Sequence, residues 1–299
     1  MEKNRSPISF PLLVMKNVTM LELLWVNLLL LSELASITGA WQRRPTLVII
    51  RMPNTYPYNR YQPRTYRKEA VSDDLVSFRV AVDETDVLIS AGKDLSKEAV
   101  DIVTELRSDI KDYIQANHIF AAALRPVLCG KDAPAIIKDM VKASWPCDVG
   151  PMASVAGAVA EAVGKRLSRF SPQVIVENGG DIFILSGKSR TIGIHTGCAS
   201  VFKDKLALRI EPEDTPCGIC TSSSTIGHSL SFGKADAVVV ISPSAPLADA
   251  CATALCNSVK TEKDIVRVIR FGRALKGIRG ILIVVNGRLG AWGNIRLVH

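Results

Sequence analysis

The stretch PLADACATALCN at residues 246–257 constrains the packing of this chain more than any other segment. It predicts a helix of small, apolar residues whose surface carries little bulk. Asp249 and Thr253 stand four residues apart and therefore share one face of that helix. Two oxygens on such a face suit a hard cation such as Mg²⁺. A capped helix, in which Asp249 complements the helix dipole and Thr253 bonds back to a carbonyl, is the simpler interpretation of the segment alone.

A second small-residue helix is predicted at residues 150–164, GPMASVAGAVAEAVG. Its lack of bulk allows another backbone or a flat ligand to approach closely. Helices of this kind are typical of tight contacts between subunits or subdomains, so a homo-oligomer is one expectation.

The composition indicates an ordinary globular protein, because 47% of the 299 residues are hydrophobic and 22% are charged. The net charge is +8, but no basic run is interleaved with aromatic residues, so a nucleic-acid partner is not expected. Seven cysteines, an odd number scattered through apparent core segments, indicate a reducing compartment and hence a cytoplasmic protein. Cys217 and Cys220 form a single CxxC without a second pair, which favours structural thiols over a zinc site.

The first fifty-one residues contain the most hydrophobic run of the chain, at residues 20–31. It is too short to span a bilayer and it includes Glu22 and Asn27. We interpret residues 1–51 as an upstream extension, with translation starting at Met52. A weak membrane-associated helix and a cleaved signal rank second and third. Residues 52–74 are expected to form an irregular arm, followed by the main domain at 75–299.

The rest of the pattern alternates irregularly between helices and paired strands, which favours the α+β class with mixed or antiparallel sheets. Ser96 is expected to cap a helix. Another helix is expected at 133–142, and a basic amphipathic helix at 262–276. The predicted strands are 75–82, 86–90, 174–177, 182–185, 191–195, 235–241, 280–285 and, after an Asn-Gly hairpin turn, a last strand running through Val298.

Two polar segments follow predicted strands. Asn178, Gly179, Gly180 and Asp181 form a turn that either lets the backbone approach a ligand or simply bonds its own backbone. The hydroxyl run from Thr221 through Ser222 and Ser223 to Thr225, with His228 beyond it, suits phosphate or ribose contacts, although such runs are also common in plain loops. No Walker A sequence, dinucleotide fingerprint or nucleophile elbow occurs.

Three of these segments together resemble the motifs of the ApbE superfamily of flavin transferases. They are the Gly-Gly-Asp turn, the hydroxyl loop ending at His228 and the ADACATAL helix. The order and sequence of these segments resemble even more closely an uncharacterised ApbE-like family of archaea and anaerobic bacteria. That family shares the Tyr66-Arg67 arm, the 150–157 segment, the 177–181 turn and the loop that begins at Cys220. The resemblance extends from about Gln62 to the C-terminus, and it implies an α+β fold with two closely associated lobes.

The resemblance also implies a site at which Mg²⁺ and the diphosphate of FAD meet. Asp249 and Thr253 match the metal ligands, and Asp249 and His228 would serve catalysis. The nucleotide contacts would be Gly157, Asn178, Gly179, Gly180, Asp181, Thr221, Ser222, Ser223 and His228. In the superfamily reaction an acceptor hydroxyl displaces AMP and leaves an FMN phosphoester.

The sequence departs from the transferases at one position that matters for phosphate chemistry. Ala156 stands where they usually carry a lysine, and Glu161 stands where they tend to have Asp. Two other functions therefore stay open. One is anaerobic sulfur assimilation into homocysteine with Cys220 as sulfur carrier, and the other is a non-catalytic module for a small nucleotide or acidic metabolite.

Overall fold

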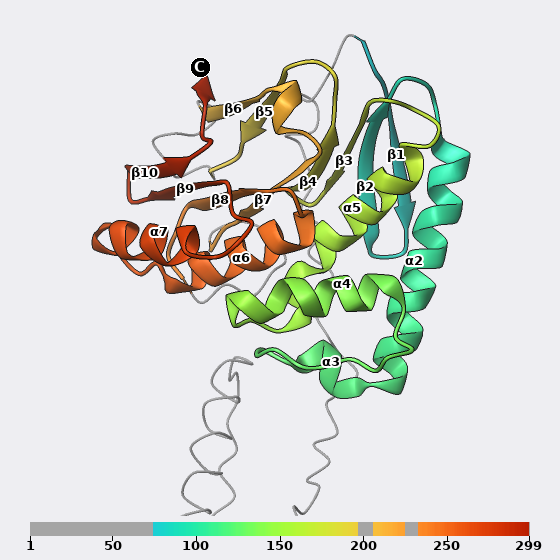
Figure 1. Cartoon of the computed structure of the whole chain (residues 1–299), viewed down its shortest axis with the longest axis horizontal. Helices are drawn as coiled ribbons and strands as arrows, with labels where there is room; N and C mark the ends of the chain where they lie inside the picture. The colour runs from blue at the N-terminus through green and yellow to red at the C-terminus, as the bar shows by residue number, and fades with distance from the viewer. Residues whose placement is uncertain (1–73, 197–205, 225–232, 299) are drawn as a thin grey trace, which may run out of the picture. The chain divides into compact units, whose positions relative to one another are not determined.

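The computed structural model describes residues 74–196, 206–224 and 233–298 of the chain (Figure 1). These residues belong to one compact unit. The extension at 1–51 and most of the expected arm lie outside them. No helix among the described residues is long and apolar enough to cross a membrane.

An eight-stranded sheet forms the centre of this unit, and its neighbouring strands all run antiparallel. In spatial order the strands are β1 (Val76–Val82), β2 (Thr85–Ala91), β3 (Val174–Asn178), β4 (Asp181–Leu185), β7 (Cys217–Ser222), β8 (Ala237–Ser242), β9 (Gly280–Val285) and β10 (Arg288–Gly293). A smaller sheet has the order β11 (Leu297–Val298), β6 (Leu206–Ile210) and β5 (Arg190–Ile194). The α+β prediction is confirmed.

The helices lie on one face of the large sheet. They are α2 (Ser96–Ala116), α3 (His118–Ala122), α4 (Ala135–Ser144), α5 (Val155–Leu167), α6 (Ala245–Ser258) and α7 (Ile265–Arg273). Short 3₁₀ turns precede or connect them: η2 (Trp145–Cys147), η3 (Pro151–Ser154), η4 (Pro212–Asp214) and η5 (Glu262–Asp264).

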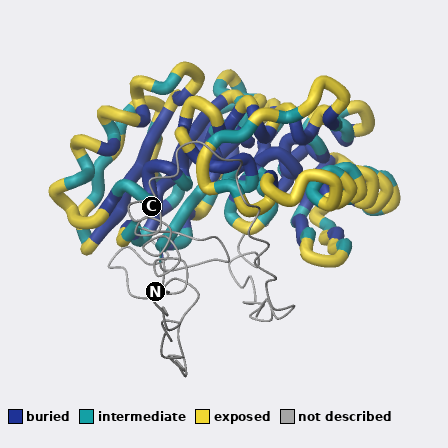
Figure 2. The backbone as a smooth tube through the Cα atoms, turned by 90° about the horizontal axis from the view of Figure 1, so that it is seen from below, coloured by how far each residue is buried: buried dark blue, intermediate teal, exposed yellow. Residues whose placement is uncertain are grey.

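The core follows from the two-residue period of the strands. Val238 and Val240 of β8 face the cluster built with α6 and α7, whereas Val239 and Ile241 face the cluster under the small sheet. Because both faces of β8 and β9 are covered, every residue of these strands is buried, and Figure 2 shows the central strands in dark blue.

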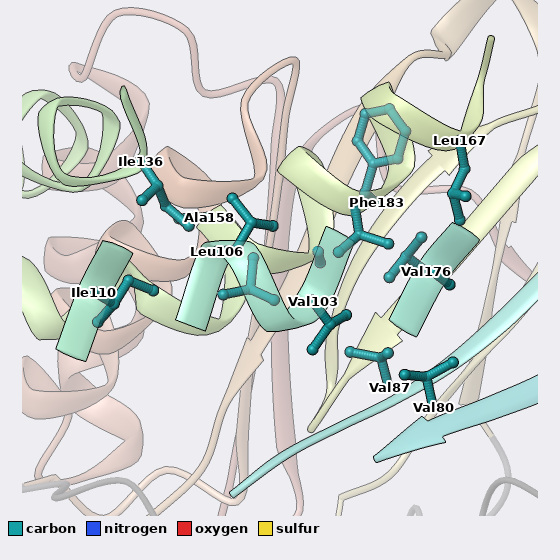
Figure 3. Packing of buried hydrophobic residues seen from close by; sticks show 14 of the residues in the cluster. Val80, Val87, Val103, Leu106, Ile110, Ile136, Ala158, Leu167, Val176 and Phe183 are labelled. Carbon is teal, nitrogen blue, oxygen red and sulfur yellow. The ribbon is translucent and has the colours of Figure 1, made fainter. Parts of the chain in front are cut away.

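The third cluster lies on the helix-covered face of the sheet, over strands β1 to β4. There α2 contributes Val103, Leu106 and Ile110; Val103 lies near Val87 of β2 and Val176 of β3, and Ile110 lies nearer Ile136 of α4 (Figure 3). The apolar spacing in α2 predicts a buried face of Val100, Val103, Leu106, Ile110 and Ile114. The structure buries Val103, Leu106 and Ile110, half-buries Ile114 and leaves Val100 42% exposed, with Ala99 buried in its place.

Three local predictions differ from the structure. Ser96 is the first residue of α2 rather than its cap, and its backbone N–H donates to Asp94 Oδ1 at 2.8 Å. The segment expected as one helix from residue 150 begins as the 3₁₀ turn η3, and α5 starts only at Val155. The final strand ends at Gly293, whose φ of 77° redirects the chain so that β11 joins the small sheet.

The two small-residue helices pack against each other within the chain. A Cβ on Gly157 of α5 would lie 2.5 Å from the carbonyl oxygen of Ala245 in α6. A Cβ on Gly218 of β7 would lie 2.2 Å from the Cα of the same alanine. The low bulk of these helices therefore serves an internal contact, and it is no argument for an oligomer.

Candidate functional site

The β3–β4 turn lies beside the first turn of α5. Asn178 Nδ2 donates to the carbonyl oxygen of Ala156 at 3.2 Å. Gly179 and Gly180 connect the strands with φ values of 71° and 102°, a conformation that favours glycine at both positions. The side chain of Glu177 accepts from the Gly180 N–H at 2.9 Å. The turn is thus held from both sides, and its backbone is free of side-chain bulk.

Asp249 joins α6 to the beginning of α5. Its Oδ2 accepts from the backbone N–H of Gly157 at 2.9 Å, although the two residues are 92 positions apart. Gly157 is the third residue of α5, so this N–H is one that no carbonyl of the helix can reach. Asp249 therefore caps α5 and not its own helix, where the Ser244 side chain is the cap. The simple capping interpretation of Asp249 is wrong about the helix involved.

Glu161 makes the reciprocal contact. Its Oε2 accepts from the backbone N–H of Ala245, the first residue of α6, at 2.5 Å. Its other oxygen, Oε1, accepts from Lys165 at 2.5 Å. Each helix therefore supplies a buried carboxylate to the N-terminus of the other, which favours a fixed crossing of α5 and α6. In the sequence, Glu161 stands out only as a departure from a motif. Its one early signal is that it is the only acidic residue in α5.

Asp181 is the first residue of β4 and lies opposite Cys220 of β7. It is 8% exposed, and its Oδ1 has no hydrogen-bond partner among the described residues. Burial raises the pKa of Asp181 well above its usual value, and the charges of Asp249 and Glu177 raise it further. A hydrogen bond from the Cys220 thiol and another from the Thr221 backbone partly offset these effects. A buried carboxylate oxygen without a partner is costly, and it is typical of a site for a ligand or an ion.

Asp249 shares this environment. Burial raises its pKa to about 7, against the opposing effect of the backbone N–H groups of Gly157 and Ala156. None of the groups that most affect the pKa of Asp181 or Asp249 is basic. The site is therefore a buried pair of interacting carboxylates that a cation would stabilise.

Cys220 of β7 lies beside Asp181 and contacts the first residue of α6. It is fully buried, and its Sγ lies 3.3 Å from the Ala245 carbonyl oxygen, so its single S–H donates either there or to Asp181. Burial and the nearby charges of Asp181 and Asp249 raise the pKa of the Cys220 thiol well above its usual value. Such a thiol stays protonated near neutral pH and is a poor nucleophile.

The hydroxyl run is only partly brought to the site. Thr221 and Ser222 end β7, Thr221 donates its backbone N–H to Asp181, and Ser223 follows directly. Ser224 turns away and donates its hydroxyl to the Ala235 carbonyl oxygen at 2.7 Å. His228 lies outside the described residues, so its role stays a prediction.

The donors for a metal ion are few. Thr253 is half-buried on the face of α6 that carries Asp249. Within 74–196, 206–224 and 233–298, no group of three or more His, Cys, Asp or Glu side chains is placed to hold a metal ion. This set resembles the protein side of a Mg²⁺ site that takes one or two carboxylates and completes its shell with water and substrate phosphates.

Comparison with known proteins places this arrangement in a family. The family model described as "AbpE bacteria" matches residues 68–272, which include every described residue of the site. The chain belongs to this family. The AbpE-type chain is also 38% identical over 223 residues to a UPF0280 protein of Methanocaldococcus jannaschii, covering 73% of this chain and 90% of that protein. A UPF0280 protein of Methanosarcina acetivorans is 37% identical over 215 residues, with 71% and 84% covered.

Solved structures give more distant matches. The flavinyl transferase ApbE of Pseudomonas stutzeri has a TM-score of 0.48 and 14% identity, over 75% of this chain and 96% of that one. The flavin transferase ApbE of Vibrio cholerae has a TM-score of 0.46 and 16% identity, over 74% and 97%.

Proposed function

We propose that this protein binds a flavin or a related diphosphate nucleotide together with Mg²⁺, between the β3–β4 turn and the N-terminal ends of α5 and α6. The observation that carries the proposal is the buried pair Asp181 and Asp249, in which Asp181 Oδ1 lacks a partner among the described residues. Membership in the family and the motif resemblance support the choice of a flavin nucleotide.

The local charges support a strict need for the cation. Helix N-termini commonly bind phosphate through their free N–H groups. Here Asp249 occupies the amide of Gly157 in α5, and Glu161 occupies that of Ala245 in α6. Ala156 supplies no positive charge. A diphosphate placed beside two carboxylates would be repelled, so Mg²⁺ bound by Asp249, Thr253 and Asp181 would supply the neutralising charge.

The same charges bear on the reaction. Phosphoryl transfer depends on positioning and on stabilising the charge that develops at the phosphate. Without a lysine at Ala156, the site retains its nucleotide-holding elements but lacks a fixed cation for that charge. We therefore propose nucleotide binding as the primary function, and FMN transfer to an acceptor hydroxyl only as the second candidate.

The structure argues against the sulfur-carrier alternative. A persulfide carrier needs a thiolate that a donor can reach, whereas Cys220 is fully buried and its thiol pKa is raised.

Thermal denaturation with FAD tests the proposal. FAD is expected to raise the melting temperature in the presence of Mg²⁺ and to have little effect in EDTA. Asp249→Ala should abolish the shift, whereas Asp139→Ala, which removes an exposed carboxylate on α4, should retain it. The absence of any FAD-dependent shift, with or without Mg²⁺, would overturn the proposal.

A further inference from the structure

The two outermost helices of the helical layer carry opposite charges. Helix α2 packs against β1, one edge strand of the large sheet, and α7 packs against β9 and β10 at the other edge. Between them, α2 contacts α4 and α5, α5 contacts α6, and α6 contacts α7 (Figure 1). Both end helices therefore lie on the same face of the sheet, at its two opposite sides.

Helix α7 and its flanks concentrate the positive charge of the chain. Residues 260–279 contain seven Lys or Arg and only two Asp or Glu. The buried residues of α7 are Val268 and Gly272, so Arg270 and Arg273 lie on the outer face. Neither arginine forms an ion pair with a described residue, whereas Arg267 is paired with Asp264 at 2.8 Å. We call Arg267, Arg270 and Arg273, with the exposed neighbours Lys263, Lys276 and Arg279, the basic row.

Helix α2 carries the complementary pattern. Acidic residues recur every three or four positions and therefore follow one side of the helix. This acidic row consists of Asp94, Glu98, Asp101, Glu105, Asp109 and Asp112. It flanks the core face made by Ala99, Val103, Leu106 and Ile110, and its members are exposed or half-buried. Glu105 is paired with Arg166, but Glu98, Asp101 and Asp109 form no ion pair with a described residue.

The two rows cannot meet within one chain, because α4, α5 and α6 lie between them in the helical layer. We propose that the basic row of one copy docks on the acidic row of a second copy of this chain. The contact is head-to-tail, and such contacts generate rings or open chains rather than a closed pair. This proposal is independent of the nucleotide site.

Sedimentation of the full chain tests the proposal without any ligand. Species larger than the 32.4 kDa monomer are expected at about 50 mM salt and should dissociate at about 500 mM, because salt screens exposed charges. Arg270→Glu with Arg273→Glu should weaken association at least roughly tenfold. Asp101→Lys with Asp112→Lys should do the same. Lys131→Glu with Lys138→Glu, two exposed residues outside both rows, matches the charge change of the arginine variant and should leave association unchanged.

Mixing the two reversed proteins separates specific docking from a general charge effect. Each alone should remain largely monomeric, because the net charge of its altered row falls in size from six to two. The mixture should form assemblies that contain both proteins. A monomeric wild-type chain at low salt would overturn the proposal, as would a mixture that fails to associate. Binding of an oligonucleotide by the basic row of a chain that stays monomeric would assign the row to another partner and would also overturn it.

Discussion

At the scale of single residues, the candidate site is defined by two buried carboxylates whose main interaction partners include no basic group. Asp181 and Asp249 are buried close enough for each charge to affect the other, yet their strongest partners are backbone N–H groups and a thiol. Burying such a pair lowers the stability of the protein without a ligand. Arrangements of this kind are retained where function requires them.

Asp181→Asn is therefore expected to stabilise the ligand-free protein. The pKa of Asp181 is raised on folding, so the folded state binds its proton more tightly, and this group lowers stability as the pH rises above about 4. The amide cannot ionise and lacks this effect. At pH 8 the variant should melt roughly 2–6 °C above the wild type, and the difference should shrink toward pH 4.

The same variant should lose the FAD-dependent shift measured with Mg²⁺. Thermal denaturation at several pH values, with and without FAD, checks both halves. A variant that is less stable than the wild type at pH 8 would contradict the account of the carboxylate pair.

A second residue-scale prediction concerns the thiols. Burial raises the pKa of the Cys217 thiol to about 12, and that of Cys220 is also raised. Neither should react with iodoacetamide at pH 8 in the folded protein, whereas both should react in urea. Peptide mass spectrometry measures the extent of alkylation at each cysteine, with half-buried Cys129 as the internal comparison. Rapid modification of native Cys220 would revive the sulfur-carrier alternative.

At the scale of elements, the two small-residue helices act as one unit. Gly157 permits the close approach of α5 to α6, and Asp249 and Glu161 then cap the opposite helices. The position of Asp249 in the site consequently depends on a residue of the other helix.

Glu161→Leu should cost about 1–2 kcal/mol of unfolding free energy, because the Ala245 N–H loses its buried acceptor. Glu161→Gln keeps an acceptor oxygen and should lose clearly less. Urea denaturation measures both, and titration with FAD and Mg²⁺ should show weaker binding for the leucine variant. Equal losses for the two variants would mean that the cap contributes little.

The carboxylate of Asp264, at the start of α7, is expected to stabilise the fold when it ionises, which is the opposite of the effect of Asp181. Asp264 accepts from the backbone N–H groups of Lys260 and Thr261, both at 3.0 Å, and pairs with Arg267. These contacts hold the pKa of Asp264 well below its usual range. Its contribution to stability is present above about pH 4 and is lost as the pH falls below that value. Asp264→Asn should therefore be less stable than the wild type at pH 7, and the gap should narrow at pH 3.

At the scale of the whole molecule, the sequence predicts local features better than distant pairings. The α2 core face, the Gly179–Gly180 turn and the Asn286–Gly287 hairpin each follow from spacing within a few residues. The strand order does not, since β4 and β7 are neighbours across 31 intervening residues. The small sheet is predicted only in part: strands are expected at 191–195 and through Val298, but β6 is not, and nothing in the spacing indicates that these strands form a separate sheet.

The candidate site shows the same division. Asn178, Gly179, Gly180, Asp181 and Asp249 were recognisable as motifs, and the structure brings them together. The reciprocal caps cannot be recognised from the sequence, because Glu161 and Ala245 are 84 positions apart and nothing near either residue marks the contact. The absence of a hydrogen-bond partner for Asp181 Oδ1 among the residues that the structure describes likewise emerges only from packing.

Native mass spectrometry of the full chain with FAD, in the presence and absence of Mg²⁺, tests the central claim most directly. The account predicts one FAD per chain when Mg²⁺ is present, accompanied by the metal, and no FAD when the metal is chelated. An FAD adduct that forms equally well in EDTA, or persists in Asp249→Ala, would contradict the assignment of the buried carboxylate pair as the cation site.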